Sequence, residues 1–342
     1  MHTPWPHQER GVQSVLQKIA EGFVRILFFS PTGTGKTYTC VMLIKHFLDR
    51  GKRVVFYTNR RMLLDQTTKV FGGWNIDHGV RAPGHTDERW KPFQIASLQT
   101  EVLRLKEPDK NRGWTLHDAD LVIIDEAHVN GGPSVQKIAE HHVQQGAVIV
   151  GPTATPIDLG HMYDVMVEGC TLKEGRACGA LVPALVYGPD EPDLKRIKQV
   201  AGEDISEKQQ RQVMMTPTIY GRVWDWFNTL NPAHKPTIGF APGVAESFGF
   251  AADFHRRGIG AAHIDGEKVW INGKEFESSP TVRDELQQMH KEGEIKVLWN
   301  RFVLREGVDM PWAEVGILAA IFGSLSSNIQ AIGRLLRASP KT

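Results

Sequence analysis

The stretch that most constrains this chain runs from Ile26 to Leu43 and reads ILFFSPTGTGKTYTCVML. Its first four residues are apolar and are typical of a buried parallel strand. Apolar residues then recur at helical spacing from Val41 onward, until Gly51 ends the helix. Between strand and helix, Ser30–Thr37 fits the pattern Gly-x-x-x-x-Gly-Lys-Ser/Thr, with Ser in place of the first Gly. We therefore predict a phosphate-binding P-loop at this position.

The residue types of this loop suit phosphate chemistry better than they suit a plain connecting turn, which is the alternative. Small residues let backbone N–H groups wrap around phosphates, and the following helix N-terminus adds a favourable dipole. Lys36 is predicted to reach the β- and γ-phosphates, and the Thr37 hydroxyl to bind Mg²⁺. The predicted phosphate-binding residues are Thr32, Gly33, Thr34, Gly35, Lys36 and Thr37.

Composition sets the class of protein. A chain of 342 residues is longer than one typical domain, so two domains are expected. Hydrophobic residues make up 41% and charged residues 23%, as in ordinary globular proteins. No apolar run approaches the ~20 residues of a membrane span, so no membrane partner is expected. Cys40, Cys170 and Cys178 match neither a disulfide framework nor a zinc pattern, which predicts a reduced, cytoplasmic protein.

A second buried strand ends in acidic residues. Residues 119–128 read ADLVIIDEAH, so Asp125 and Glu126 follow an apolar run directly. Acids after a strand can be helix caps. Beside a P-loop, however, this is the position of a carboxylate that holds Mg²⁺, here Asp125, followed by a residue that orients or deprotonates the attacking water, here Glu126.

The net charge is only +1, so a nucleic-acid partner would have to bind in a local cleft.

Taken in order, the motifs resemble those of the superfamily-2 DEAD/DEAH-box helicases and translocases. In chain order the matching stretches are WPHQERGVQSVL at 5–16, SPTGTGKT at 30–37, FYTNRRMLLDQ at 56–66, IASLQT at 95–100, DEAH at 125–128, TATP at 153–156, IGFAPGVAES at 238–247, VLWNRFVLREGVDMP at 297–311 and QAIGRLLR at 330–337. The motif sequences are most similar to those of the phage and bacterial UvsW-like branch. Each short motif is weak alone, whereas the ordered set is specific.

The resemblance implies roles for further residues. Gln8 is similar to the glutamine of the adenine-sensing motif, and Arg334 and Arg337 to arginine fingers that reach the γ-phosphate. The other implied nucleotide-site residues are Gln330, Gly307 and Asp309. His128, Thr153 and Thr155 are expected to couple hydrolysis to domain motion. The residues expected to contact phosphates of one nucleic-acid strand are Thr58, Asn59, Arg60, Ser97 and Thr100.

Short apolar strands alternate with helices in both halves of the chain, which predicts an α/β protein with mainly parallel sheets and helices on both faces. The resemblance implies two RecA-like domains with the ATP site in the cleft between them. We expect residues 1–158 to form the first domain and residues 159–342 the second. The chain ends just after the last motif, so we also expect the second domain to lack a C-terminal strand and tail.

These features predict a nucleic-acid-dependent ATPase, with ATP and Mg²⁺ as cofactors, that acts as a DNA helicase or translocase. Single-stranded or branched DNA is the expected partner, RNA is the alternative, and the protein is expected to be a monomer. Two other classes stay open at this point. One is a P-loop kinase, disfavoured by the second α/β half with its paired arginines. The other is a helicase relic that binds nucleic acid without turnover, disfavoured by the intact Lys36, Asp125, Glu126 and Arg337.

Overall fold

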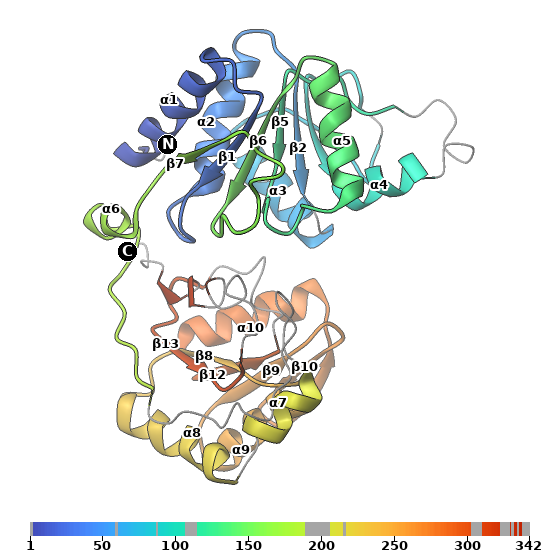
Figure 1. Ribbon diagram of the computed structural model, residues 1–342. Coiled ribbons are helices and arrows are strands. Elements are labelled where there is room, and N and C mark those ends of the chain that lie inside the picture. The colour runs from blue at the N-terminus through green and yellow to red at the C-terminus, as the bar shows by residue number, and fades with distance from the viewer. Residues whose placement is uncertain are drawn as a thin grey trace. The chain divides into compact units, whose positions relative to one another are not determined.

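The computed structural model describes residues 3–58, 61–86, 88–106, 115–188, 206–214, 217–301 and 310–321, together with residues 329, 332, 333, 335 and 336. The chain divides into two compact units, residues 1–181 and residues 182–342. Each unit is built on a sheet of its own, as Figure 1 shows. The predicted α/β class is confirmed in both units.

The first unit holds a sheet in which, among the described residues, seven strands lie in the order β3-β4-β2-β5-β6-β1-β7. All of their pairings are parallel. The strands are β1 (Arg25–Phe29), β2 (Val54–Thr58), β3 (Gly79–Arg81), β4 (Phe93–Ser97), β5 (Leu121–Ile124), β6 (Val148–Thr153) and β7 (Val165–Glu168). The helices are α1 (Pro6–Ala20), α2 (Lys36–Leu48), α3 (Arg61–Gly73), α4 (Leu98–Lys106), α5 (Pro133–Gln144) and α6 (Leu172–Ala177).

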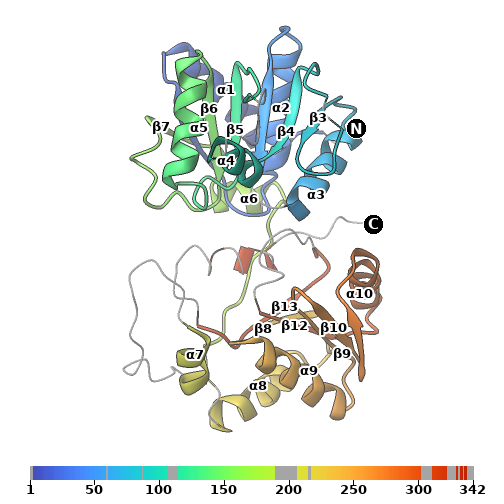
Figure 2. The ribbon, with the colours of Figure 1, turned by 90° about the vertical axis from the view of Figure 1, so that its right-hand side faces the viewer.

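Helices cover both faces of this sheet (Figures 1 and 2). Because successive strand residues point to opposite faces, one strand supplies two cores. In β2, Phe56 packs with residues of α1, α2 and α3, whereas Val55 and Tyr57 pack with residues of α4 and α5. The central strands β2 and β5 are therefore buried at every position, as their mainly apolar sequences predicted.

The boundary between the units lies later in the chain than the sequence indicated. We expected the first domain to end at residue 158, but β7 pairs in parallel with β1, and the first compact unit extends to residue 181. Since Ile26 lies opposite Val165 in that pairing, the segment after TATP completes the first sheet. The strand β7 is only four residues long and half-exposed, which makes its periodicity weak as a sequence signal.

The second unit holds a sheet in which, among its described residues, six strands lie in the order β11-β10-β9-β12-β8-β13. The strands are β8 (Thr237–Phe240), β9 (Ala261–Ile264), β10 (Lys268–Ile271), β11 (Lys274–Glu277), β12 (Val297–Asn300) and β13 (Val315–Leu318). The helices are α7 (Glu207–Met214), α8 (Pro217–Leu230), α9 (Val244–Arg256) and α10 (Pro280–Glu292). One core packs against α10 and the other against α8 and α9. Among the described residues of the chain, none of the helices has the length and apolar character that a membrane crossing requires.

The hairpin β10–β11 was not anticipated from the sequence. It pairs antiparallel with β9 at one edge of an otherwise parallel sheet. Its turn is Asn272-Gly273, and both residues have positive φ, +45° and +95°. This is the sequence and backbone of a tight two-residue hairpin turn. The signal was therefore present in VWINGKEF, but the expected strand–helix alternation hid it.

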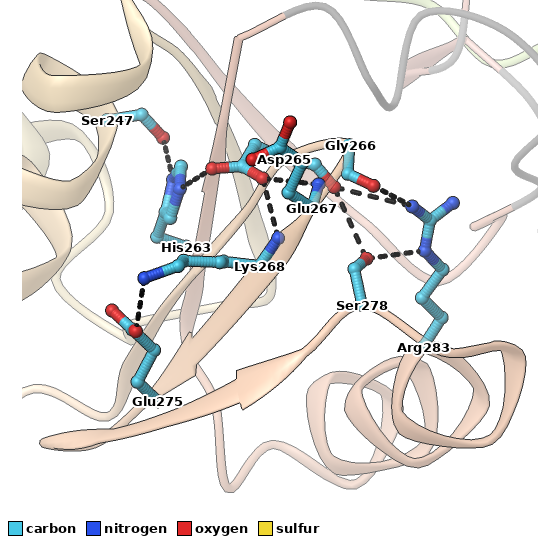
Figure 3. Close-up of polar contacts among 9 residues, drawn as sticks. All are labelled: Ser247, His263, Asp265, Gly266, Glu267, Lys268, Glu275, Ser278 and Arg283. Atoms are coloured by element: carbon cyan, nitrogen blue, oxygen red, sulfur yellow. Dashed lines mark hydrogen bonds and ion pairs between the residues drawn. The ribbon is translucent and has the colours of Figure 1, made fainter.

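A polar cluster holds together the two ends of this hairpin, at Asp265–Lys268 and Ser278, which we call its neck (Figure 3). Asp265 Oδ1 accepts hydrogen bonds from the backbone N–H groups of Glu267 and Lys268, each at 2.7 Å. The other oxygen, Oδ2, lies 3.0 Å from His263 Nε2, and His263 Nδ1 lies 2.6 Å from Ser247 Oγ on α9. Burial lowers the pKa of His263, while Asp265 acts in the opposite direction. A neutral His263 that donates to Asp265 and accepts from Ser247 satisfies all three side chains.

Helix α10 contacts the same neck through Arg283 (Figure 3). Its Nε donates to Ser278 Oγ at 2.8 Å, and its Nη2 donates to the carbonyl oxygens of Asp265 and Gly266, each at 3.4 Å. Ser278 Oγ in turn donates to the Asp265 carbonyl at 3.3 Å. The neck of the hairpin is thus fixed to α9 through His263 and to α10 through Arg283.

Replacing His263 by Ala should destabilise the second unit by about 1–3 kcal/mol, because the buried Ser247 and the half-buried Asp265 each lose a hydrogen-bond partner. Hydrogen exchange over residues 244–278 should show reduced protection. The control is Lys274→Ala, at an exposed position of the same hairpin. Equal protection in the two variants would mean that the cluster does not fix the neck.

Candidate active site

The predicted P-loop connects β1 to α2, and its own side chains hold its shape. Thr34 Oγ1 donates to the Pro31 carbonyl at 2.6 Å and lies 2.6 Å from Ser30 Oγ. The Ser30 backbone N–H donates to the Thr153 carbonyl on β6 at 3.0 Å. Ser30, which stands where the pattern has Gly, therefore takes part in the loop through its hydroxyl. Both Ser30 and Thr34 are buried.

Two glycines give the loop its turn. Gly33 and Gly35 have φ of +90° and +79°, a conformation that favours glycine. Gly35 is the N-cap of α2, so the loop ends at the N-terminus of a 13-residue helix. Lys36 is the first residue of that helix, and Thr37 follows it with an exposed side chain. Thr32 is half-buried. This backbone is suited to binding phosphate.

Gln8 lies on α1 against the same loop, and its side chain is 1% exposed. Its Nε2 donates to the carbonyl oxygens of Thr34 at 3.3 Å and Gly35 at 3.4 Å. Its Oε1 accepts from the backbone N–H of Trp5 at 2.9 Å. His7 Nε2 also lies 2.9 Å from the Thr34 carbonyl oxygen. The structure thus brings the predicted adenine-sensing stretch and the P-loop together.

The acidic residues follow β5, which lies beside β6 in the sheet, and β6 lies beside β1. The carboxyl ends of these parallel strands bring the P-loop and the acids to one edge. The Glu126 N–H donates to Asp125 Oδ1 at 3.0 Å. Glu126 has φ of +48°, the left-handed region that is strained for a residue with a side chain, and such strain gathers at functional sites. Glu126 Oε2 is buried and has no hydrogen-bond partner among the described residues.

Electrostatics distinguish Asp125 from an ordinary surface acid. Desolvation and the neighbouring Glu126 raise the pKa of Asp125 to about 7, while Lys36 acts in the opposite direction. The neighbouring carboxyl groups of Asp125 and Glu126 have only one nearby ammonium group, that of Lys36, which is too little positive charge to balance two carboxylates. A divalent cation would supply it, and carboxylate and hydroxyl oxygens are the ligands that Mg²⁺ prefers. Asp125 and Thr37 therefore suit the predicted metal.

The sequence reasoning missed Asn130. This buried side chain donates from Nδ2 to the Asp125 carbonyl at 2.7 Å and lies 3.5 Å from the Glu126 carbonyl. It therefore holds the backbone turn that carries both acids. No residue pattern pointed to this role, because an Asn two positions after DEAH has no distinctive spacing.

Thr153 connects the acids to the P-loop. Its Oγ1 lies 3.0 Å from His128 Nδ1 and accepts from the Thr155 N–H at 3.1 Å. The same hydroxyl donates to the Thr155 carbonyl at 3.2 Å, so His128 must be the donor in its own bond with Thr153. His128 Nδ1 is also 3.5 Å from Glu126 Oε2. The three residues predicted to couple hydrolysis to motion thus form one bonded group that also touches Ser30 and Glu126.

The predicted nucleic-acid contacts within the described residues lie together. Thr58 ends β2 and Ser97 ends β4, and these two residues are partners in the strand register. Thr100, on α4, donates from Oγ1 to Ser97 Oγ at 3.0 Å. The Thr58 hydroxyl is buried and has no hydrogen-bond partner among the described residues. Asn59 and Arg60 lie outside the described residues.

Five predicted nucleotide-site residues of the second half lie outside the described residues, and their roles stay predictions. They are Gly307, Asp309, Gln330, Arg334 and Arg337.

Comparison with known proteins bears on the family. Residues 1–158 match the family described as Type III restriction enzyme, res subunit. A 51.5 kDa protein of a Lactococcus phage is 29% identical over 313 residues, which cover 90% of this chain and 62% of that protein. The chain spans less than two thirds of the length of the curated relatives it matches.

Solved structures share the fold. The DUF1998 helicase MrfA bound to DNA superposes with a TM-score of 0.64 at 16% identity, over 97% of this chain and 47% of that one. The ATP-dependent Type ISP restriction-modification enzyme LlaBIII bound to DNA gives 0.68 at 17% identity, over 99% and 27%. The predicted pair of RecA-like domains is therefore confirmed as a fold. The finer similarity to the UvsW-like branch stays a prediction. The family match over residues 1–158 and the shared fold agree with the ordered motifs, which resemble those of the superfamily-2 helicases and translocases.

Proposed function

We propose that this chain is a nucleic-acid-dependent ATPase that acts as a DNA helicase or translocase. The observation that supports this most is the arrangement at one edge of the first sheet. There the P-loop with Lys36, the acids Asp125 and Glu126, and the bonded group around Thr153 lie at the ends of β1, β5 and β6. Phosphate binding, metal binding and a base for water are the three requirements of nucleotide hydrolysis.

In this proposal ATP and Mg²⁺ bind at the P-loop. Loop backbone N–H groups and Lys36 would bind the phosphates, and Thr37 and Asp125 would hold the metal, directly or through water. When bound, Mg²⁺ neutralises the charge that develops on the phosphates. Thr32, Gly33, Thr34 and Gly35 form the remainder of the cradle. The second unit would contribute Gly307, Asp309, Gln330, Arg334 and Arg337, with the two arginines as the positive charges that approach the γ-phosphate.

Glu126 is the proposed base. Its Oε2 is buried, accepts no hydrogen bond from a described residue and lies 3.5 Å from His128 Nδ1. A carboxylate oxygen that accepts no hydrogen bond has its lone pairs available for a proton from water. Asn130 holds the turn beneath it. A change at Glu126 would reach Thr153 through His128, which is the proposed route from hydrolysis to opening and closing of the two domains on a nucleic-acid strand.

DNA is the proposed partner, single-stranded or branched, with RNA as the alternative. The two similar structures named above are bound to DNA. Thr100 presents a half-exposed hydroxyl beside the buried Ser97 and Thr58, and Asn59 and Arg60 follow Thr58 directly in the sequence. Hydroxyl, amide and guanidinium donors suit phosphate oxygens and carry little base preference. We further propose that the protein acts as a monomer in the cytoplasm.

The partner is tested by DNA binding at several salt concentrations. If the contacts are mainly to phosphate, the logarithm of the binding constant should fall linearly with the logarithm of salt, by about 0.7 per phosphate contacted on a single strand. Arg60→Ala should weaken binding to all sequences alike. It should also make that slope shallower by about 0.7, the value for one phosphate contact on a single strand. Arg256→Ala, at an exposed position of the second unit, is the control. Salt-independent binding would contradict the phosphate contacts, and tighter binding to an RNA strand of matched sequence would favour the alternative.

A further inference from the structure

The side chain of Gln8 is already committed within the protein. Both ends of its amide bond to backbone groups, and only 1% of its surface is exposed. We propose that Gln8 is a positioning residue for the phosphate-binding loop and does not read the base of the nucleotide. The inference rests on the proposed nucleotide hydrolysis, and it departs from the adenine-sensing role that the resemblance implied.

The neighbouring groups determine which way the amide points. The Trp5 N–H can only donate, so it requires the oxygen Oε1. The carbonyls of Thr34 and Gly35 can only accept, so they require the NH₂ group. If the amide were flipped, its oxygen would face the carbonyl oxygens of Thr34 and Gly35, and none of the three can donate a hydrogen bond. Both N–H donors are then occupied, which leaves none for a ring nitrogen of a base. Although Oε1 has a second lone pair that could accept a hydrogen bond, solvent hardly reaches this side chain.

The contact has a geometric consequence for the loop. A trans peptide is planar, with its C=O and N–H on opposite sides. Gln8 and His7 both hold the Thr34 carbonyl toward α1, at 3.3 Å and 2.9 Å. The N–H of Gly35, in the same peptide unit, therefore points away from α1. Backbone N–H groups of this loop are the ones expected to bind phosphate. Gln8 thus sets the direction of a phosphate donor rather than contacting the nucleotide.

Gly35 and Gln8 fit each other closely. A Cβ atom added to Gly35 would lie 2.2 Å from Gln8 Nε2, closer than real side chains allow. The positive φ of Gly35 brings the loop backbone against the amide. The glycine is therefore required by its own backbone conformation, and a side chain there would displace the Gln8 amide.

A second layer supports this arrangement from α6. Cys178 Sγ lies 3.7 Å from His7 Nδ1. A Cβ atom at Gly175 would lie 3.2 Å from Thr34 Cγ2, so the helix packs directly on the loop. Arg10 on α1 forms an ion pair with Glu174 at 2.7 Å. Residues of α1 and α6 thus enclose the outer side of the loop, as a positioning role requires.

The test compares ligands with and without a base. Binding of ATP, GTP and inorganic tripolyphosphate, each with Mg²⁺, is measured for the wild type, Gln8→Ala and Gln8→Met. Methionine keeps the length and apolar packing of the side chain, so it serves as the second variant if the alanine protein does not fold. Removal of these hydrogen bonds should weaken all three ligands by a similar factor, about tenfold, with the ATP-to-GTP ratio unchanged. The control is Gln13→Ala, at an exposed position of the same helix.

A purely structural role would lower thermal stability without this uniform loss in ligand binding, so melting temperatures are measured alongside. His7→Phe removes the other bond to the Thr34 carbonyl and should weaken the same three ligands together. The inference is overturned if Gln8→Met weakens ATP but leaves tripolyphosphate unchanged, because Gln8 would then read the base. It is also overturned if no ligand is affected. A wild type that binds none of the three ligands would instead refute the proposed function itself.

Discussion

Replacing Glu126 by Gln should lower ATP turnover by about 100- to 10,000-fold, the usual contribution of a general base, while nucleotide binding is nearly kept. The amide has the same shape as the carboxylate and can retain the strained backbone at φ +48°, but it cannot accept the proton from water. Single-turnover phosphate release measures the chemical step, and equilibrium binding of ATP measures the rest. A loss in turnover without a loss in binding places the defect in the transition state.

Two comparisons support the reading of that result. Glu168→Gln makes the same change at an exposed position of β7 and should have no effect. Lys36→Ala should weaken nucleotide binding itself, because it removes a charge proposed to contact the phosphates. If the Glu126 variant released phosphate at the wild-type rate, the assignment of the base would be wrong.

The second large effect concerns stability. Arg81 at the end of β3 and Glu101 on α4 form an ion pair of 2.9 Å in which both side chains are buried, at 5% and 0% exposure. Arg81 also donates to the Thr115 carbonyl at 2.5 Å. Arg81→Met leaves the Glu101 carboxylate buried without its partner, which should cost about 3–5 kcal/mol of unfolding free energy. Urea unfolding followed by circular dichroism measures the loss.

This defect should depend on pH in a defined direction. Burial raises the pKa of Glu101 above its usual value, and Arg81 opposes that rise. Without Arg81 the pKa rises further, so the folded variant binds a proton more tightly than the unfolded chain does. Its deficit relative to the wild type is therefore largest above the raised pKa and shrinks as the pH falls toward the ordinary glutamate value. The loss should be smaller at pH 5 than at pH 7.5.

Two variants separate the buried pair from salt bridges in general. Lys52→Met breaks an exposed pair with Asp120 and should cost less than about 1 kcal/mol. The double change Arg81→Met with Glu101→Leu removes both buried charges and should recover most of the stability. An Arg81→Met protein as stable as the wild type would mean that Glu101 is protonated or hydrated in the fold.

The sequence predicted the elements that carry strong local signals. The P-loop and the DEAH strand each combine an apolar run with residue types that few other structures need, so their positions followed. Two elements with weak or masked signals were missed. The strand β7 is short and half-exposed, and its place beside β1 depends on tertiary pairing. The turn Asn272-Gly273 did signal a hairpin, but the expected βα alternation concealed it.

Side-chain roles were harder to predict than strands. The motif placed Gln8 near the nucleotide, and the structure does bring it to the P-loop. Only the folded structure shows that its amide bonds to the loop carbonyls and is hardly exposed. Asn130 holds the turn beneath Asp125 and Glu126 through a backbone carbonyl. A contact to backbone leaves no trace in the pattern of residue types, so spacing alone could not reveal it.

The most direct test of the proposed function is ATP turnover with and without polynucleotides. Phosphate release is measured for the wild type with no polymer and with single-stranded, duplex, forked and RNA polymers, and Lys36→Ala gives the background. We predict that single-stranded or forked DNA raises the rate above the polymer-free rate and that Lys36→Ala stays at background throughout. A wild-type rate that no polynucleotide changes would contradict the account.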